Sequence, residues 1–196
     1  MCAIFGSFDT SMFEVLYEAN KQRGNFASSI VSLSDDDQFI RKKKGDINFD
    51  KFNYAGKKNI ESHNGVLTNH KKVKREYCNF IQNNVDTAVI ANTLEHFTQT
   101  EHGKGTVIVN PVPIIKKTLQ LLSGTYALSI VFCDTNEVFL ARSGSILHCN
   151  TKGDYSTMPG TGFKEIPEGV IVKLNNRTRR WNKVGKFKHD SPFSFI

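Results

Sequence analysis

The sequence predicts an α+β protein in which two β-sheets pack face to face with helices outside them. Strand-like segments lie near both ends of the 196-residue chain, and helical patterns occupy its middle. This length is enough for one domain with a sizeable core. We therefore expect a single domain over residues 1–196, with a basic C-terminal extension that starts at about residue 175.

The first two elements are a buried strand and a helix. The strand is expected from Cys2 to Phe8, and the helix runs from there to about Arg23. The residues from Asp9 to Ser11 all offer N-cap side chains, and Ser11 with Glu14 has the spacing of a capping box. The N-terminal part of the chain therefore pairs a strand with a well-marked helix.

Three further strands are expected before residue 66. Two of them cover residues 27–34 and 38–44, on either side of three aspartates at 35–37 that we interpret as turn formers rather than metal ligands. A third strand leads to His63 and ends in a turn at Asn64 and Gly65.

The middle of the chain is helical. Helical patterns cover residues 69–82 and 86–98, and another helix starts at Pro111 and Pro113 and runs to Gly124. Strand-like runs then follow at 125–133, 137–142, 145–149 and 170–174.

Cys2 is the residue whose position suggests chemistry most clearly. Removal of Met1 would leave Cys2 with a free α-amine, which titrates near ~7.7 and could take the thiol proton. Cysteine is small enough for methionine aminopeptidase to act on Met1. The alternative is an ordinary cysteine in a buried strand.

The formal net charge of +7 comes from clusters of lysine and arginine. The last cluster, from Arg177 to Lys188, also contains Trp181 and Phe187. This mixture could follow phosphates and stack on a base, but it could equally be a solvated extension or a dock for an acidic partner. Nucleic acid is therefore one candidate partner, without a motif to support it.

The cysteines and the hydropathy indicate the compartment. The four cysteines form no Cys-x-x-Cys pair, and no stretch of about 20 apolar residues or secretory leader is visible. We therefore expect a cytoplasmic protein with no membrane partner, no metal and no cofactor.

Four segments resemble the class II glutamine amidotransferase domain, a family of N-terminal nucleophile (Ntn) hydrolases. They are Cys2–Gly6, His63–Gly65, Asp86–Ile90 and Ala141–Ser145, in the family's order. The chain is most similar to the glutaminase domain of glucosamine-6-phosphate synthase and to short stand-alone bacteriophage members. The resemblance implies a four-layer αββα sandwich and, for a phage protein, the cytoplasm of the infected bacterium.

The resemblance also implies catalytic roles. Cys2 would attack the side-chain amide of glutamine, giving a γ-glutamyl thioester and ammonia, and water would then release glutamate. Asn64 and Gly65 suit the oxyanion, because the asparagine NH₂ donates and glycine lets its backbone N–H approach closely.

Three further residues are substrate-binding candidates by the same resemblance. Asp86 would bind the α-ammonium of glutamine, and it also suits the start of a helix. Arg23 matches an arginine that follows the first helix, where it would support the nucleophile strand or favour the helix C-terminus. His63 precedes the asparagine, and we expect it to pack beside the site rather than act as a general base.

The chain departs from the family between Arg23 and Asn64. It lacks the His-x-Arg-x-x-Thr loop whose arginine grips the substrate α-carboxylate. Arg41 and the lysines at 42–44 are the remaining candidates for that role. Ala3 and Ala88 also replace a glycine and an acid that are usual in the family.

These observations leave three hypotheses open. The first is a glutamine amidotransferase subunit that supplies ammonia to a separate synthetase. The second is an N-terminal cysteine amidase for another amide, which substrate comparison would distinguish from the first. The third is an inactive protein that uses the fold to bind a ligand, a partner or nucleic acid.

Overall fold

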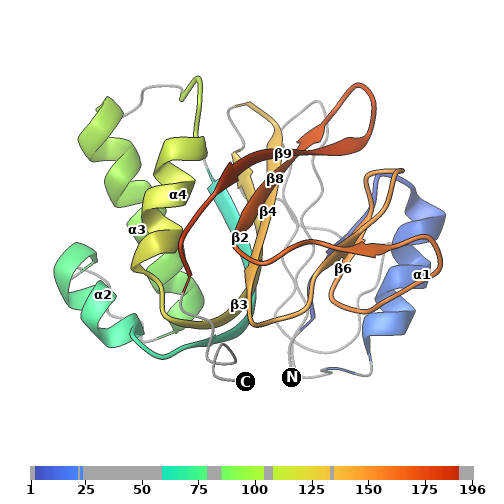
Figure 1. Cartoon of the computed structure of the whole chain (residues 1–196), viewed down its shortest axis with the longest axis horizontal. Helices are drawn as coiled ribbons and strands as arrows, with labels where there is room; N and C mark the ends of the chain where they lie inside the picture. Colours follow the sequence, from blue (N-terminus) through green and yellow to red (C-terminus); the bar gives the residue numbers. More distant parts are fainter. Residues whose placement is uncertain are drawn as a thin grey trace, which may run out of the picture.

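The computed structural model describes residues 3–21, 23, 59–78, 85–103, 108–132 and 135–189. These residues form two antiparallel sheets (Figure 1). The smaller sheet has the order β1 (Phe5–Gly6), β6 (Tyr155–Ser156), β5 (His148–Cys149), β7 (Lys164–Glu165). The larger sheet has the order β2 (Asn59–Leu67), β3 (Gly124–Phe132), β4 (Glu137–Ser143), β8 (Val170–Asn175), β9 (Arg180–Lys186).

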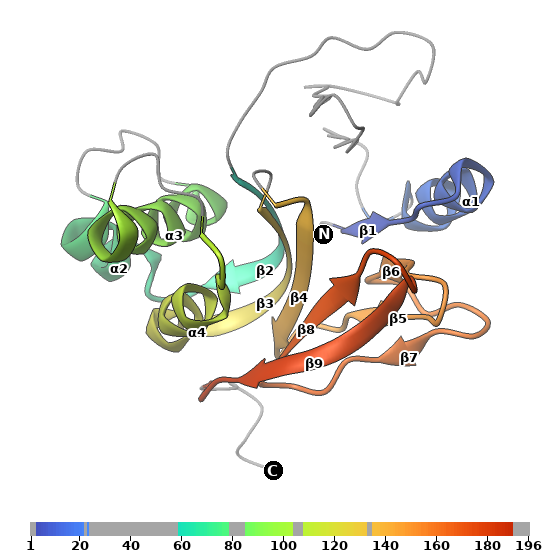
Figure 2. The same ribbon diagram turned by 90° about the horizontal axis from the view of Figure 1, so that it is seen from above.

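Helices cover the outer sides of the two sheets (Figure 2). Helix α1 (Thr10–Lys21) lies beside the smaller sheet, where the Phe13 ring packs 5.2 Å from the Phe5 ring of β1. Helices α2 (His70–Tyr77), α3 (Asp86–His102) and α4 (Val112–Leu121) lie together beyond the larger sheet. The order helix, sheet, sheet, helices confirms the predicted αββα sandwich.

Strand β3 separates two cores, because successive side chains of a strand point to opposite faces. The helix-side core lies between the larger sheet and its helices; it includes Leu67, Ile90, Leu94, Phe97, Ile114, Ile115, Leu119, Tyr126, Leu128, Ile130, Phe139 and Ile171. The inter-sheet core lies between the two sheets and consists of Ile4, Ala127, Leu140, Leu147, Ile166, Val170 and Val172. Burial of the β3 residues on both faces explains why its sequence is an almost continuous apolar run.

The cap of α1 differs in part from the expectation. The Asp9 carboxylate accepts a hydrogen bond from the Met12 N–H at 3.1 Å, so Asp9 is the N-cap. Ser11 lies inside the first turn, because the helix begins at Thr10. The capping box of Ser11 with Glu14 was therefore wrong, whereas Asp9 was among the predicted caps.

Asn64 and Gly65 do not form a turn, contrary to the expectation. Strand β2 continues through them to Leu67 and pairs with β3 along its whole length. The chain turns afterwards, at Thr68 and Asn69. The Asn69 side chain stabilises this turn by donating to the Leu121 carbonyl at 2.7 Å and accepting from the Ser123 N–H at 3.0 Å.

The basic segment after residue 175 belongs to the larger sheet rather than forming an extension of it. Strand β9 pairs with β8 from Arg180 to Lys186, with an irregularity in register beside Ile171 and Val172. Its lysines are exposed, but Phe187 is only 6% exposed and stacks on Tyr126 with ring centroids 6.3 Å apart. The Trp181 ring packs edge-on against Tyr155 at 6.0 Å.

The two aromatic side chains therefore support the cores instead of offering exposed stacking surfaces for bases. This removes the main sequence argument for nucleic-acid binding.

The other predicted elements either agree with the structure or fall outside the described residues. Helices α2, α3 and α4 confirm the three central helical patterns. The strands expected at 27–34 and 38–44, with the aspartates at 35–37, lie outside the described part of the chain.

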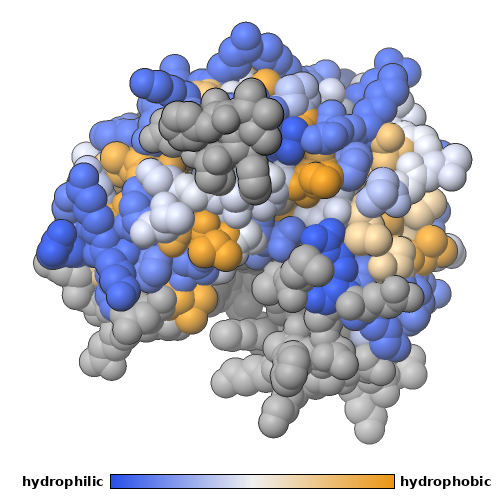
Figure 3. Space-filling model, turned by 60° about the horizontal axis from the view of Figure 1, so that its bottom comes forward, coloured by the Kyte–Doolittle hydropathy of each residue, from blue (hydrophilic) through white to orange (hydrophobic). Residues whose placement is uncertain are grey.

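On the face shown in Figure 3, apolar residues form small separate patches among hydrophilic ones. Among the residues that the structure describes, no helix has the length and hydropathy of a membrane span.

Candidate active site

Strand β2 carries three of the predicted site residues. Asn64 pairs with Ala127 of β3, and His63 pairs with Leu128. Directly opposed residues of an antiparallel pair point to the same face. Ala127 belongs to the inter-sheet core and Leu128 to the helix-side core, so the Asn64 side chain points toward the smaller sheet and His63 toward α3.

Gly65 occupies a position that only glycine fits. Its φ of +150° lies in a region that residues with a Cβ rarely adopt, and a Cβ there would lie 2.0 Å from the Thr125 carbonyl oxygen. Strand β3 therefore presses directly on the backbone of Gly65. This contact fixes the strand next to Asn64, which is 9% exposed.

Asp86 is the first residue of α3 and lies against the end of β2. One carboxylate oxygen accepts from the Leu67 N–H at 3.3 Å, and the other from the Thr87 N–H at 2.8 Å. The N-cap position itself is occupied by Val85. The Asp86 side chain is 24% exposed, so an incoming cation can reach its negative charge.

His63 is the buried neighbour of Asp86. Its side chain is 2% exposed, and Nδ1 lies 3.6 Å from Asp86 Oδ1 and 3.3 Å from Thr87 Oγ1. Burial lowers the pKa of His63 below its ordinary value of 6.5, while Asp86 and the Thr125 carbonyl work against this shift. Within the described residues, Nε2 makes no hydrogen bond. A neutral ring that faces Asp86 is the state that this environment favours, and the role of His63 beside the site stays a prediction.

The strand that leads from Cys2 is fixed by a buried polar cluster. The Ile4 N–H donates to Thr157 Oγ1 at 3.2 Å, and the Ile4 carbonyl accepts from the Thr157 N–H at 2.9 Å. Asn20 of α1 donates to Ser156 Oγ at 3.0 Å. A Cβ on Gly6 would lie 2.4 Å from the Tyr155 ring, so glycine is needed where β1 meets β6.

Arg23 joins this cluster. Its guanidinium donates to the Thr157 carbonyl at 2.9 Å. Thr157 is the residue that pairs with Ile4, so Arg23 supports the strand after Cys2, one of the roles expected of it. Binding of substrate by Arg23 stays a prediction.

The predicted site residues thus lie partly at the inter-sheet space and partly on the helix side of the larger sheet. Ile4 and Ala127 are members of one core cluster, and Ala127 is the residue opposite Asn64. Cys2 lies outside the described residues, as do Arg41 and residues 42–44. Asp86 contacts β2 three positions beyond Asn64, on the side of the helices.

Two other cysteines are described, and neither is suited to be a nucleophile. Burial raises the pKa of Cys149 to about 11 and also raises the pKa of Cys78, whose thiol lies 3.3 Å from Thr93 Oγ1. In the described part of the chain no three His, Cys, Asp or Glu side chains are grouped to hold a metal ion.

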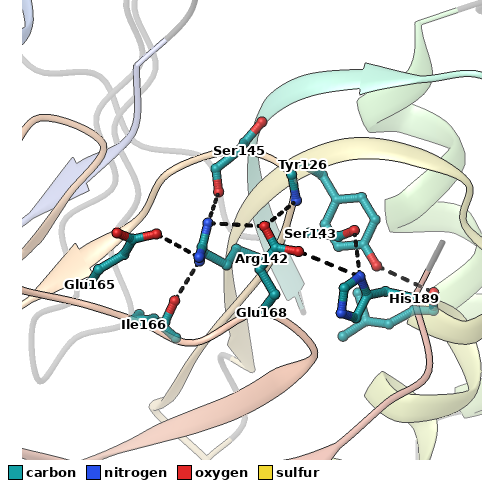
Figure 4. A network of polar contacts seen from close by, with 10 residues as sticks. Tyr126, Arg142, Ser143, Ser145, Glu165, Ile166, Glu168 and His189 are labelled. Carbon is teal, nitrogen blue, oxygen red and sulfur yellow. Dashed lines mark hydrogen bonds and ion pairs between the residues drawn. The ribbon is translucent and has the colours of Figure 1, made fainter. Parts of the chain in front are cut away.

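A polar network at the end of β4 was not predicted from the sequence (Figure 4). Arg142 donates to the Ser145 carbonyl at 3.0 Å and to the Ile166 carbonyl, and it pairs with Glu165 and Glu168. The Ala141–Ser145 motif marked this segment in the sequence, but it gave no indication of which acids meet Arg142.

Comparison with known proteins shows what the chain is similar to. No protein-family model matches the sequence. The chain is 33% identical over 115 residues to a glutamine–fructose-6-phosphate aminotransferase (isomerizing) of Geobacillus kaustophilus (strain HTA426). It is 32% identical over 92 residues to the enzyme of the same name from Bacillus subtilis (strain 168). These matches cover 57% and 43% of this chain but only 17% and 14% of the two relatives.

Solved structures show the same fold. A glutamine phosphoribosylpyrophosphate amidotransferase from B. subtilis matches 95% of this chain and 49% of its own with a TM-score of 0.67, at 16% identity. An allosteric regulatory enzyme of purine biosynthesis matches 88% of this chain and 34% of its own with a TM-score of 0.50. The chain has the fold of the class II glutamine amidotransferases, which are Ntn enzymes, and is related to them in sequence.

Proposed function

We propose that this protein is a glutamine amidotransferase subunit that hydrolyses the side-chain amide of glutamine and supplies ammonia to a synthetase on a separate chain. The observation that carries the proposal is the register of β2 against β3. It turns Asn64 toward the inter-sheet space, into which the strand after Cys2 packs through Ile4.

The roles of the residues follow from this arrangement. After loss of Met1, the Cys2 thiolate attacks the amide carbon while the α-amine holds the proton. The Asn64 NH₂ and the Gly65 N–H donate to the oxyanion of the tetrahedral intermediate. The intermediate collapses to a γ-glutamyl thioester, the proton passes to the leaving nitrogen, and ammonia departs.

Water then attacks the thioester and releases glutamate, which regenerates the thiol. Asp86 binds the α-ammonium of glutamine, because its carboxylate is partly exposed and held in place by two backbone N–H groups. Such a fixed charge costs no reorganisation when the substrate arrives.

The acceptor of the ammonia is proposed at the level of class only. The curated relatives are several times longer than the matched segment, so their other parts have no counterpart in the match. The bacteriophage origin and the cytoplasm of an infected host stay predictions from resemblance.

The test is the intact mass of the purified protein before and after incubation with 6-diazo-5-oxo-norleucine, a reactive glutamine analogue. We expect loss of Met1 and one covalent adduct, which Cys2→Ala abolishes and Cys149→Ala does not. Retained Met1, or processing without an adduct, would contradict the proposal. Glutaminase assays against asparagine and γ-glutamyl amides would then decide between another amide and a non-catalytic role.

A further inference from the structure

We propose that Glu168 is a positioning residue for the oxyanion site: it holds the Ser143–Ser145 loop against the strand that presses on Gly65. The inference rests on the proposed function, in which Gly65 donates to the oxyanion. It assigns a role to a carboxylate that lies outside the motifs described above.

The first step is the contact of Gly65 with β3. A Cβ at Gly65 would lie 2.0 Å from the Thr125 carbonyl oxygen and 2.8 Å from Tyr126 Cα. The position of Thr125 therefore determines where the backbone of Gly65 lies. An oxyanion donor must lie within a few tenths of an ångström of its productive place.

The second step places the Ser143–Ser145 loop behind Thr125. Gly144 has a φ of +68°, and a Cβ there would lie 2.8 Å from Thr125 Cγ2. Gly144 also forms an isolated bridge with Tyr126. Thr125 is thus held between Gly65 on one side and Gly144 on the other, and a shift of Gly144 would release it.

The third step is the set of contacts by which the Glu168 carboxylate fixes this loop (Figure 4). Glu168 Oε1 accepts from the Gly144 N–H at 3.2 Å and lies 3.4 Å from Arg142 Nη1. Its other oxygen lies 3.7 Å from His189 Nδ1, and that nitrogen also contacts Ser143 Oγ at 3.3 Å. One carboxylate therefore joins the loop, β4 and the segment after β9.

Glu168 is itself held by the residue that follows it. Gly169 has a φ of +68°, its N–H donates to the Arg142 carbonyl at 3.2 Å, and its carbonyl accepts from the Phe187 N–H at 2.9 Å. A Cβ on Gly169 would lie 2.7 Å from the His189 ring. The backbone next to Glu168 is therefore fixed between β4 and the end of β9. This fixes the position from which the Glu168 side chain extends.

Glu165 provides a matched control. It also pairs with Arg142, but its side chain is 49% exposed and no contact joins it to Gly144 in the described structure. Removal of Glu165 therefore takes away one acid from Arg142 and leaves the hold on the loop in place.

The experiment compares glutamine hydrolysis by the wild type, Glu168→Ala, Glu168→Gln and Glu165→Ala at a temperature well below every unfolding midpoint. For Glu168→Ala we expect kcat to fall about tenfold or more, less than the roughly 100- to 1,000-fold for loss of a donor, with KM within about twofold. Glu168→Gln keeps an oxygen for the Gly144 N–H and should recover kcat to within about threefold. Equal kcat for Glu168→Ala and Glu165→Ala, or a change in KM alone, would overturn the inference.

A second measurement keeps the test independent of glutaminase activity. The backbone amide resonances of Gly65 and Gly144 in a ¹⁵N NMR spectrum should shift in Glu168→Ala and stay in place in Glu165→Ala. If the wild type hydrolyses no glutamine but these shifts occur, the proposed function fails while the structural link stands. An unmoved Gly65 resonance in Glu168→Ala overturns the link whatever the activity.

Discussion

His63 and Asn64 are adjacent in the sequence, yet their side chains lie on opposite faces of β2. His63 meets Asp86 at the start of α3, while Asn64 faces the smaller sheet. The His63 and Asn64 side chains are therefore separated by the thickness of one strand. Under the proposed function, we expect mutations to change the binding of the substrate ammonium and the stabilisation of the oxyanion separately.

Gly65→Ala should destabilise the protein and lower kcat. The new methyl group would meet the Thr125 carbonyl, and the backbone would keep an unfavourable φ, so we expect a loss of about 2–4 kcal/mol in the free energy of unfolding. Gly162→Ala is the matched control, because Gly162 also has a positive φ of +80° but no atom within 4 Å of the new Cβ. Urea unfolding of both variants measures the difference, and equal losses would refute the close contact.

Asp86→Asn should raise KM for glutamine by about 10- to 100-fold and change kcat little, because a charged hydrogen bond to the ammonium contributes roughly 1.5–3 kcal/mol. Glu101→Gln removes a negative charge near the other end of α3, where Glu101 pairs with Lys117, and serves as the control. Steady-state kinetics at fixed ionic strength give both values. A fall in kcat at unchanged KM would contradict the proposed ammonium site.

The buried His63 should make stability depend on pH. Its pKa is lowered in the folded protein, so the unfolded chain binds the proton more readily, and the free energy of unfolding falls as pH drops through about 6.5. The loss is at most about 1.4 kcal/mol for each unit by which the pKa is lowered. Urea unfolding at several pH values should show a shallower slope between about pH 7.5 and 5.5 for His63→Gln than for the wild type.

The same pair gives a measurement on the histidine itself. Because Asp86 raises the pKa of His63 against the effect of burial, Asp86→Asn should lower that pKa further. An NMR titration of the His63 ring protons measures this directly. A rise in the pKa on removal of Asp86 would show that the two side chains are not coupled as the structure has them.

Phe187→Ala should cost about 3–5 kcal/mol of stability, because the ring is buried in the helix-side core and stacks on Tyr126. Lys188→Ala next to it changes an exposed side chain and should stay within about 0.5 kcal/mol of the wild type. Thermal or urea unfolding of the pair distinguishes a core residue from an exposed base-stacking one. Similar stability for the two variants would indicate that Phe187 is an exposed residue able to stack on a base rather than a core residue.

Sequence patterns predicted the helices and strands of this fold wherever apolar residues recur with one clear period. The apolar spacing of α3 and the prolines at the start of α4 are local signals, and both helices lie where they were expected. Asn64 and Gly65 were misread because Asn-Gly is typical of tight turns. Their place inside a strand depends on the approach of Thr125, sixty residues further along the chain, which local propensity does not contain.

The candidate site also has parts that local motifs predict and parts that they do not. The nucleophile, the oxyanion residues and the ammonium site are predictions from motifs and stay predictions, whereas the contacts of Glu168 with Gly144 and Arg142 were not predicted. Glu168 reaches Gly144 across 24 positions, and His189 reaches Ser143 across 46. Such contacts arise because β4 pairs with β8 and β8 pairs with β9, and neither charge nor spacing in a single sequence reveals them.

Strand β9 also has a consequence for the behaviour of the protein in solution. It ends the larger sheet, and no other described strand pairs with its outer edge, which leaves backbone groups open to a second molecule. Lys183 and Lys186 are exposed on this strand. Two copies meeting edge to edge would bring these like charges together, at a cost of about 1 kcal/mol for each pair at 4 Å in water. We therefore expect the positive charge to oppose pairing through β9, and self-association through this strand to grow as salt screens the charge.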